Sequence, residues 1–285
     1  MDLIHKRYFR TNQNEPYYFY LSSAEIEDDI KWIDEHKIEN IRLSQYGEYS
    51  ITSIEAIFKI KTVIKRLVIF IENIDLNRLA ELKELEELGI GEPAKNINLS
   101  SFKKLKKLYL VHTKKIIGFA SLQALEELII LKAPSLFFSA ENFNRLTNLN
   151  SLTILSGKIP QQLDFLLQLT NLKELEIHNI KSTFSVAALR SLENIEILKI
   201  GCCPCVNDLI TTLPLLKHLT WLALTDSSTL DDTSFIESLP NLKVLVVLGK
   251  SYFKNGDLSN LKNKLEHVGI DNKRHYNLKY EDFQK

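Results

Sequence analysis

Apolar residues in this chain recur in the spacing L-x-x-L-x-L, which returns eleven times. Alternating apolar and polar positions predict a short strand, because successive side chains of a strand point to opposite faces. We therefore predict eleven strands, each with its fourth and sixth repeat positions in the core and its third, fifth and seventh outside. The copies start 20 to 26 residues apart, at Ile38, Ile64, Leu85, Leu105, Leu125, Leu149, Leu172, Ile195, Leu219, Leu242 and Leu265.

The segments between these strands carry apolar residues at every third or fourth position, which is the spacing of a short helix or 3₁₀ turn. Leu76, Leu79 and Leu82 show this spacing in one segment, and Leu209 and Leu213 show it in another. A single repeat cannot bury its own leucines, so neighbouring repeats must stack around a common core. We therefore expect a parallel sheet on one side and short helical turns on the other.

In repeat length, repeat number and apolar spacing, the chain resembles the leucine-rich repeat superfamily, with about eleven repeats. The resemblance implies an α/β solenoid, a horseshoe with a concave parallel β-sheet and short convex helices or 3₁₀ turns. Members of the family usually carry a buried Asn at the ninth repeat position. Here the ninth position varies, from Tyr46 and Pro93 to Ile180, Cys203 and Lys273, so the subfamily is not assigned.

Both ends of the chain depart from the repeat. Tyr17 to Leu21 predict a leading strand, and Ser22 to Lys37 predict a helix that begins with a capping box of Ser22 and Glu25. The polar residues at the C-terminal end either cover the last strand or fray. We predict a single structural domain in three parts, with an N-terminal strand-helix cap at 1–37, leucine-rich repeats at 38–271 and a C-terminal tail or cap at 272–285.

Composition narrows the class of partner. The 36 Lys and Arg residues balance the 36 Asp and Glu residues, so the chain lacks the positive field that binding to nucleic acid requires. No apolar run resembles a signal peptide or a membrane span, and three clustered cysteines are too few for a disulfide framework. We therefore expect a cytoplasmic protein that binds neither nucleic acid nor membrane.

Two groups of outward-facing positions are apolar, one in repeats four to six and the other around a tryptophan in repeats eight to ten. Contiguous exposed apolar patches usually mark contact surfaces, and Trp and Tyr are favoured anchors there. The alternative is that loops or the tail cover them. Together with three polar neighbours they form the predicted partner-binding site, which consists of Tyr109, Val111, Ile129, Leu131, Leu155, Glu176, His178, Lys199, Trp221, Val244, Val246 and Leu248.

Repeat three has a bare outward face, because Gly89 and Gly91 occupy its fifth and seventh positions. This gap either admits a bulky side chain of a partner or reflects tight curvature. The basic segment FKKLKK follows it, but Lys107 falls between Glu87 and Glu127 on the neighbouring predicted strands. Such an alternation of opposite charges stabilises a sheet, so we interpret the segment as structural rather than as a nucleic-acid patch.

The three cysteines lie together in the sequence GCCPC. A zinc site needs four ligands, and no second cysteine pair or histidine pair accompanies them. When the repeats are aligned, Cys202 falls beside His178 and Asp226. A cysteine with a neighbouring His and Asp resembles a nucleophile with its base. We interpret Cys203 instead as a small buried residue at the ninth position, and we predict no metal and no cofactor.

Other sequence motifs of common enzymes are missing. GIGEPA resembles a dinucleotide-binding turn, but Pro93 interrupts it and no full helix is predicted to follow. Phosphate-loop, zinc-protease and hydrolase signatures do not occur.

These observations favour a non-enzymatic protein-protein interaction module that binds a protein partner on its concave face. Resemblance to the wider family suggests a cytosolic bacterial immunity protein that neutralises a toxin, or an adaptor. The alternatives are a secreted host-directed effector, and an enzyme that depends on Cys202. We expect a monomer or weak self-association through the apolar positions.

Overall fold

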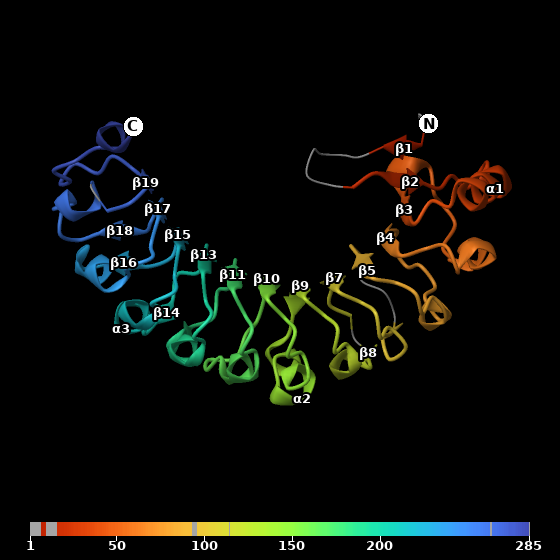
Figure 1. Cartoon of the computed structure of the whole chain (residues 1–285), viewed down its shortest axis with the longest axis horizontal. Helices are drawn as coiled ribbons and strands as arrows, with labels where there is room; N and C mark the ends of the chain where they lie inside the picture. Colours follow the sequence, from red (N-terminus) through yellow and green to blue (C-terminus); the bar gives the residue numbers. More distant parts are fainter. Residues whose placement is uncertain (1–6, 10–15, 93–95, 114, 263, 285) are drawn as a thin grey trace. The chain divides into compact units, whose positions relative to one another are not determined.

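The computed structural model describes residues 7–9, 16–92, 96–113, 115–262 and 264–284 (Figure 1). Pro93, named above for the ninth position and for the glycine motif, lies outside the described residues. By its internal contacts the chain divides into two compact units, Met1–Ile130 and Leu131–Lys285. We call these units unit 1 and unit 2.

Unit 1 contains parallel strands that are hydrogen-bonded in the order β2-β3-β4-β5-β7, and β1 pairs antiparallel with β2. Two short strands, β6 and β8, pair separately. The strands of this part are β1 (Tyr8–Phe9), β2 (Tyr18–Tyr20), β3 (Asn40–Ser44), β4 (Arg66–Phe70), β5 (Glu87–Ile90), β6 (Ile97–Asn98), β7 (Lys107–Val111), β8 (Ile116–Ile117) and β9 (Glu127–Ala133), the last of which runs past the end of unit 1.

Unit 2 repeats the arrangement, with parallel strands in the order β10-β11-β13-β15-β17-β19. Short strands again pair apart from this sheet, β12 with β14 and β16 with β18. The bounds are β10 (Ser151–Gly157), β11 (Glu174–His178), β12 (Phe184–Ser185), β13 (Ile197–Gly201), β14 (Val206–Asn207), β15 (Trp221–Thr225), β16 (Thr229–Leu230), β17 (Val244–Leu248), β18 (Tyr252–Phe253) and β19 (His267–Ile270).

All eleven predicted strands are present, and each begins at the third position of its repeat. In β13, Leu198 and Ile200 are 0% and 1% exposed, whereas Ile197 and Lys199 on the other face are half-buried. The apolar positions that alternate along the sequence are therefore the positions that face the core in the sheet. We call the face formed by the third, fifth and seventh positions the open face.

Short helices and 3₁₀ turns connect the strands, as the spacing of leucines predicted. Figure 1 shows the helical segments of unit 2, α3 among them, together on one side of its strands. No helix in the described part of the chain is long and apolar enough to cross a membrane. The helices are α1 (Ile26–His36), α2 (Ala140–Phe143) and α3 (Leu209–Thr212), and the 3₁₀ turns are Gln45–Gly47, Glu55–Ile60, Leu79–Glu81, Phe119–Ser121, Ser135–Phe137, Asp164–Gln168, Ala187–Ser191, Leu213–Leu215, Ser234–Ser238, Ser259–Leu261 and Tyr280–Phe283.

The N-terminal cap has the predicted strand and helix, but the predicted capping box is wrong. Glu25 is itself the N-cap of α1, and no side-chain hydrogen bond caps the helix. Asp29, which is 1% exposed, forms a buried ion pair with Arg7 and accepts a hydrogen bond from the Ser22 backbone N–H at 2.9 Å. Because Glu25 also pairs with Arg7, at 2.7 Å, contacts to a residue 18 positions earlier in the chain replace the local box.

The C-terminal residues pack against the last repeat. Tyr276 is 5% exposed, and its hydroxyl accepts a hydrogen bond from the Phe253 backbone N–H at 2.9 Å. The side chain of Asn277 accepts another from the Leu258 backbone N–H at 2.8 Å. These bonds satisfy backbone groups that a further repeat would otherwise bind.

Candidate functional site

The open face of unit 2 carries an apolar patch around Trp221. Ile197, Trp221 and Val244 lie directly across from one another on β13, β15 and β17, and Ala223 lies across from Val246. Trp221 is 40% exposed, and the apolar residues around it are half-buried. We call Ile197, Trp221, Ala223, Val244, Val246 and Leu248 the Trp221 patch, a partly exposed apolar surface built from three adjacent strands.

A charged cluster borders this patch. Lys199 Nζ lies 2.7 Å from a Glu174 carboxylate oxygen and 3.5 Å from one of Glu176, and 5.8 Å from the centre of the Trp221 ring. Burial opposes its charged form, but the two carboxylates outweigh burial and raise the pKa of Lys199. The hydrogen bond from His178 and the nearby Lys199 hold the pKa of Glu176 below its usual value. The cluster therefore places a fixed positive charge beside the tryptophan ring.

The open face of unit 1 carries a second cluster, in which aromatic rings surround Arg42. The Arg42 guanidinium lies over the rings of Tyr18, Tyr20 and Phe70, at 4.6, 5.5 and 5.8 Å from their centres. Arg42 also donates a hydrogen bond to the Tyr20 hydroxyl at 2.9 Å. Such cation–π contacts stabilise the position of the arginine. Tyr18 and Tyr20 are buried, so Phe70, which is 39% exposed, is the ring of this cluster that offers surface to a partner.

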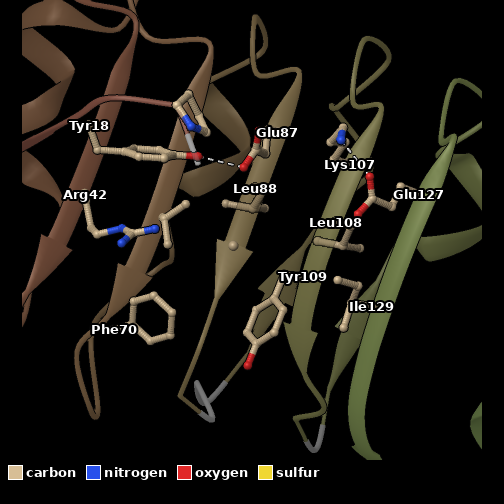
Figure 2. A pocket seen from close by; sticks show the side chains of 13 residues that line it. Tyr18, Arg42, Phe70, Glu87, Leu88, Lys107, Leu108, Tyr109, Glu127 and Ile129 are labelled. Carbon is tan, nitrogen blue, oxygen red and sulfur yellow. Dashed lines mark hydrogen bonds and ion pairs between the residues drawn. The ribbon is translucent and has the colours of Figure 1, made fainter. Parts of the chain in front are cut away.

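A pocket of about 370 Å³ opens beside this cluster (Figure 2). Figure 2 shows Tyr18, Arg42 and Phe70 on one side of the strand that carries Glu87, and Lys107, Tyr109, Glu127 and Ile129 on the other. Gly89 completes the pocket on β5, between Val68 and Tyr109 in the sheet register. The pocket is lined by Pro16, Tyr18, Arg42, Val68, Phe70, Glu87, Leu88, Gly89, Lys107, Leu108, Tyr109, Glu127 and Ile129.

Glu87, Lys107 and Glu127 each have a polar partner within this pocket. The Tyr18 hydroxyl donates to Glu87 at 2.7 Å, and Lys107 lies 2.7 Å from Glu127. Burial, together with the neighbouring Glu87, raises the pKa of Tyr18, and burial also raises the pKa of Tyr109. Both phenols are therefore neutral at physiological pH, and because Tyr18 is only 2% exposed, Tyr109 is the one of the two that offers aromatic surface.

The predicted site residues fall in both units. Tyr109 and Ile129 line the pocket of unit 1, and Trp221, Val244, Val246 and Leu248 belong to the Trp221 patch. Leu131 and Leu155 are half-buried in unit 2, where Glu176, His178 and Lys199 form the charged cluster. The structure thus places Tyr109 and Ile129 at the pocket of unit 1 and seven of the predicted residues in the Trp221 patch or the charged cluster beside it.

Val111 is a correction to the predicted site. It is only 3% exposed, so it has almost no surface to offer a partner. Val111 is the last residue of β7 and lies on the same face as Tyr109, two residues earlier.

Sequence reasoning missed the aromatic cluster around Arg42. Phe70 is the seventh residue of repeat two and is 39% exposed, and Tyr46 is 76% exposed. Arg42 holds the fifth position of repeat one, and Tyr18 comes from the leading strand before the first repeat. Reading the outward positions of the first two repeats and the cap, and not only those of repeats four to six, would have found these residues.

Among the described residues, the Cys202 thiol forms no hydrogen bond with His178 or Asp226. His178 Nε2 lies 3.1 Å from a Glu176 carboxylate oxygen, and the Asp226 carboxylate accepts a hydrogen bond from the Lys250 backbone N–H at 3.0 Å. Cys202 and Cys205 are exposed, while Cys203 is fully buried, as predicted, and its thiol donates to the Gly201 carbonyl at 3.1 Å. In the part of the chain that the structure describes, no group of three or more His, Cys, Asp or Glu residues is placed to hold a metal ion.

Comparison with known proteins identifies the fold. No family model matches the sequence, and no curated protein matches it. Among solved structures, a leucine-rich repeat protein of Leptospira interrogans is similar with a TM-score of 0.63 and 19% identity, over 90% of this chain and 72% of that one. An internalin from Listeria monocytogenes is similar with a TM-score of 0.52 and 20% identity, over 90% and 87%.

A plant peptide hormone receptor, solved in complex with RGF2, is similar with a TM-score of 0.51 and 15% identity, over 92% of this chain and 44% of that one. The three likenesses agree with the repeat spacing and with one strand in every repeat. They confirm the predicted fold class, a leucine-rich repeat solenoid with a parallel sheet, short helices or 3₁₀ turns and an N-terminal strand-helix cap.

Proposed function

We propose that this chain, which has the leucine-rich repeat fold, is a non-enzymatic module that binds a protein partner on the open face of its sheet. The Trp221 patch is the observation that carries the proposal. Trp221 is 40% exposed between two half-buried aliphatic residues that lie directly across from it, Ile197 and Val244. An exposed tryptophan within a contiguous apolar surface is typical of a binding hot spot.

The charges beside the patch support a protein rather than a nucleic acid as the partner. Lys199 is neutralised by Glu174 and Glu176, and the whole chain has a formal net charge of zero. A hot spot of this kind typically has an apolar centre and a polar rim, and Lys199, Glu176 and His178 supply that rim here.

Within this class we favour a cytosolic role, as an immunity protein that neutralises a toxin or as an adaptor. The three cysteines are free thiols, as is usual in a reducing compartment. The leucine-rich repeat structures found by comparison include a receptor solved in complex with RGF2, which supports binding as the use of the fold. The cytoplasmic location and the toxin partner belong to this proposal.

Affinity capture tests the proposal with a matched pair of variants. Immobilised wild-type protein, Trp221→Ala and Leu215→Ala would be exposed to a lysate of the source organism, with captured proteins measured by quantitative mass spectrometry. Leu215 is 52% exposed on a 3₁₀ turn in the same unit, so Leu215→Ala is the control for loss of an exposed apolar side chain. We expect Trp221→Ala to lower recovery of the partner at least about tenfold and Leu215→Ala to leave it unchanged.

Equal capture by wild type and Trp221→Ala would show that the Trp221 patch is not the binding surface. Light scattering at several protein concentrations supplies a second readout. Growth of the apparent mass in wild type but not in Trp221→Ala would assign the patch to self-association instead of to a foreign partner.

A further inference from the structure

Gly89 leaves a gap on the open face of unit 1. It lies on β5, directly across from Val68 on β4 and from Tyr109 on β7. The three atoms nearest to where a Cβ of Gly89 would stand all belong to Val68, at 3.2 to 3.6 Å. No aromatic ring therefore lies closer than Val68 to this position. Gly89 lines the pocket described above.

The chain covers two other glycines of the open face with its own aromatic rings. A Cβ at Gly91 would overlap the ring of Phe70, and a Cβ at Gly201 would overlap the ring of His178. In both cases the ring comes from the seventh position of the preceding strand. A ring packed over a strand glycine is a recurrent way to fill the space of the missing side chain. Gly89 is at the fifth position, where the preceding strand offers only Val68.

The walls of the pocket favour an aromatic occupant. Phe70 and Tyr109 stand 6.3 Å apart between ring centres, and Ile129 adds an aliphatic wall. Arg42 holds its guanidinium 5.8 Å from the centre of the Phe70 ring, so a further ring in the pocket would lie near a cation and two aromatic rings.

The charges of the pocket favour a neutral occupant. Glu87 accepts a hydrogen bond from Tyr18 and lies 3.5 Å from Arg66, and Glu127 is paired with Lys107. The lining contains two basic residues, Arg42 and Lys107, and two acidic ones. The lining therefore has no net charge to attract a charged occupant, and a neutral ring leaves the pairs of Glu87 and Glu127 intact.

We infer that this pocket receives an aromatic side chain, a phenylalanine or tyrosine, of a protein partner, with the ring packed on Gly89. The inference rests on the proposed function, because it takes the occupant to belong to a protein partner. It goes further by naming the chemistry of the side chain that unit 1 selects.

Amino acid amides test the selectivity directly on the full chain. The probes are N-acetylphenylalaninamide, N-acetylleucinamide, N-acetyllysinamide and N-acetylaspartamide, titrated against protein labelled with ¹⁵N at its 9 glycines. We expect the phenylalanine probe to shift the Gly89 and Gly91 signals saturably, with a Kd of about 1 mM, which is the range for a ligand of this size. The leucine probe should bind at least about threefold more weakly, and the charged probes more weakly still.

A matched pair of glycine variants locates the binding. Gly89→Ala puts a methyl group on the floor of the pocket, and Val68 must give way by only a few tenths of an ångström. Gly269→Ala makes the same change at the fifth position of the last repeat, where a valine, Val246, is again the neighbour, at 3.4 Å. We expect Gly89→Ala to weaken the phenylalanine probe at least about fivefold, read at Gly91, and Gly269→Ala to leave it unchanged.

A leucine probe that binds as tightly as the phenylalanine probe would overturn the inference. Tighter binding of a charged probe, no saturable shift with any probe, or unchanged binding to Gly89→Ala would do the same. If Gly89→Ala is unfolded under the conditions of the titration, Tyr109→Leu replaces it. The inference then requires that Tyr109→Leu lose the preference for the aromatic probe.

A different measurement tests the proposed function. That function is contradicted if Trp221→Ala captures as much of the partner as wild type does. The pocket at Gly89 can prefer the aromatic probe even if Trp221→Ala does not reduce capture of the partner. The Trp221 result can likewise stand if the amide probes do not bind.

Discussion

The ring of Phe70 lies directly on Gly91, where any other residue would place its Cβ. Phe70 is the last residue of β4 and remains 39% exposed, and its ring centre lies 6.3 Å from that of Tyr109. The missing side chain at Gly91 thus allows Phe70 to lie across the sheet and form a wall of the pocket. A residue that seemed to leave the face bare instead positions an aromatic ring.

We expect Gly91→Ala to lower the free energy of unfolding by about 1 kcal/mol, because the added methyl group forces the Phe70 ring out of its place. In a Phe70→Ala background the same substitution should cost almost nothing, because the ring is gone. Urea denaturation of the four proteins measures this coupling. A cost of Gly91→Ala that is the same in both backgrounds would contradict the contact.

The buried ion pair of Arg7 and Asp29 should hold the N-terminal cap together. Asp29 is 1% exposed, so Asp29→Ala removes the buried carboxylate partner of Arg7, whereas Glu25 is a partly exposed partner. We expect a loss of about 3 kcal/mol in the free energy of unfolding, because removing one partner leaves the other charge buried. Glu25→Ala is the control, and its cost should stay below about 1 kcal/mol since Glu25 is 46% exposed. Urea unfolding checks both, and equal effects of the two variants would refute the role of burial.

Substitutions at Val111 and Tyr109 should affect stability and binding differently. Val111→Ala removes two buried methyl groups and should lower the free energy of unfolding by about 1 to 2 kcal/mol, with binding of the partner unchanged. Tyr109→Ala should weaken binding and change the melting temperature less than Val111→Ala does, because Tyr109 is half-buried and Val111 is buried. Melting curves and affinity capture of both variants test the pair. Lost capture in a folded Val111→Ala protein would show that the correction to the site is mistaken.

The thiols should differ in reactivity according to their burial. Iodoacetamide should modify Cys202 and Cys205 in the native protein and reach Cys203 only after unfolding, which mass spectrometry can follow residue by residue. Cys202→Ala should leave function intact, because His178 and Asp226 are bonded elsewhere. Rapid labelling of Cys203 in folded protein would show that the ninth position is open.

Stability should also fall at alkaline pH through Cys203. Burial raises the pKa of its thiol above the ordinary value of about 9, so the folded state keeps a proton that the unfolded state releases. This contribution is intact below pH 9 and is lost as the pH rises through the folded pKa. The free energy of unfolding of Cys203→Ala, measured by urea denaturation between pH 7 and about 10.5, should therefore decline less steeply than that of wild type. Parallel curves would contradict this assignment.

The sequence predicted part of the candidate site as well as the fold, but only those features that the repeat spacing determines. The register placed Ile197, Trp221 and Val244 on one face of adjacent strands, and the structure has them directly across from one another. It also placed Cys203 in the core. It missed Arg42 and its aromatic neighbours, because their contacts join the N-terminal cap to the first repeats and follow no period.

The capping box shows the same limit. Ser22 and Glu25 have the right spacing for it, yet Arg7 binds Glu25 and Asp29 binds the Ser22 backbone. A spacing along one segment says which bonds are possible, and partners from elsewhere in the chain decide which of them form.

By itself the sequence determined the strands, their register and the side chains that enter the core, because the alternation of apolar and polar residues allows only one face of each strand to be buried. Only the tertiary structure decided which outward side chains meet. Phe70 and Gly91 are in contact, as are Arg42 and Tyr18, because adjacent strands bring residues more than 20 positions apart to within a few ångströms. Those contacts depend on the size and rotamer of each neighbour, and a repeat pattern contains no information about either.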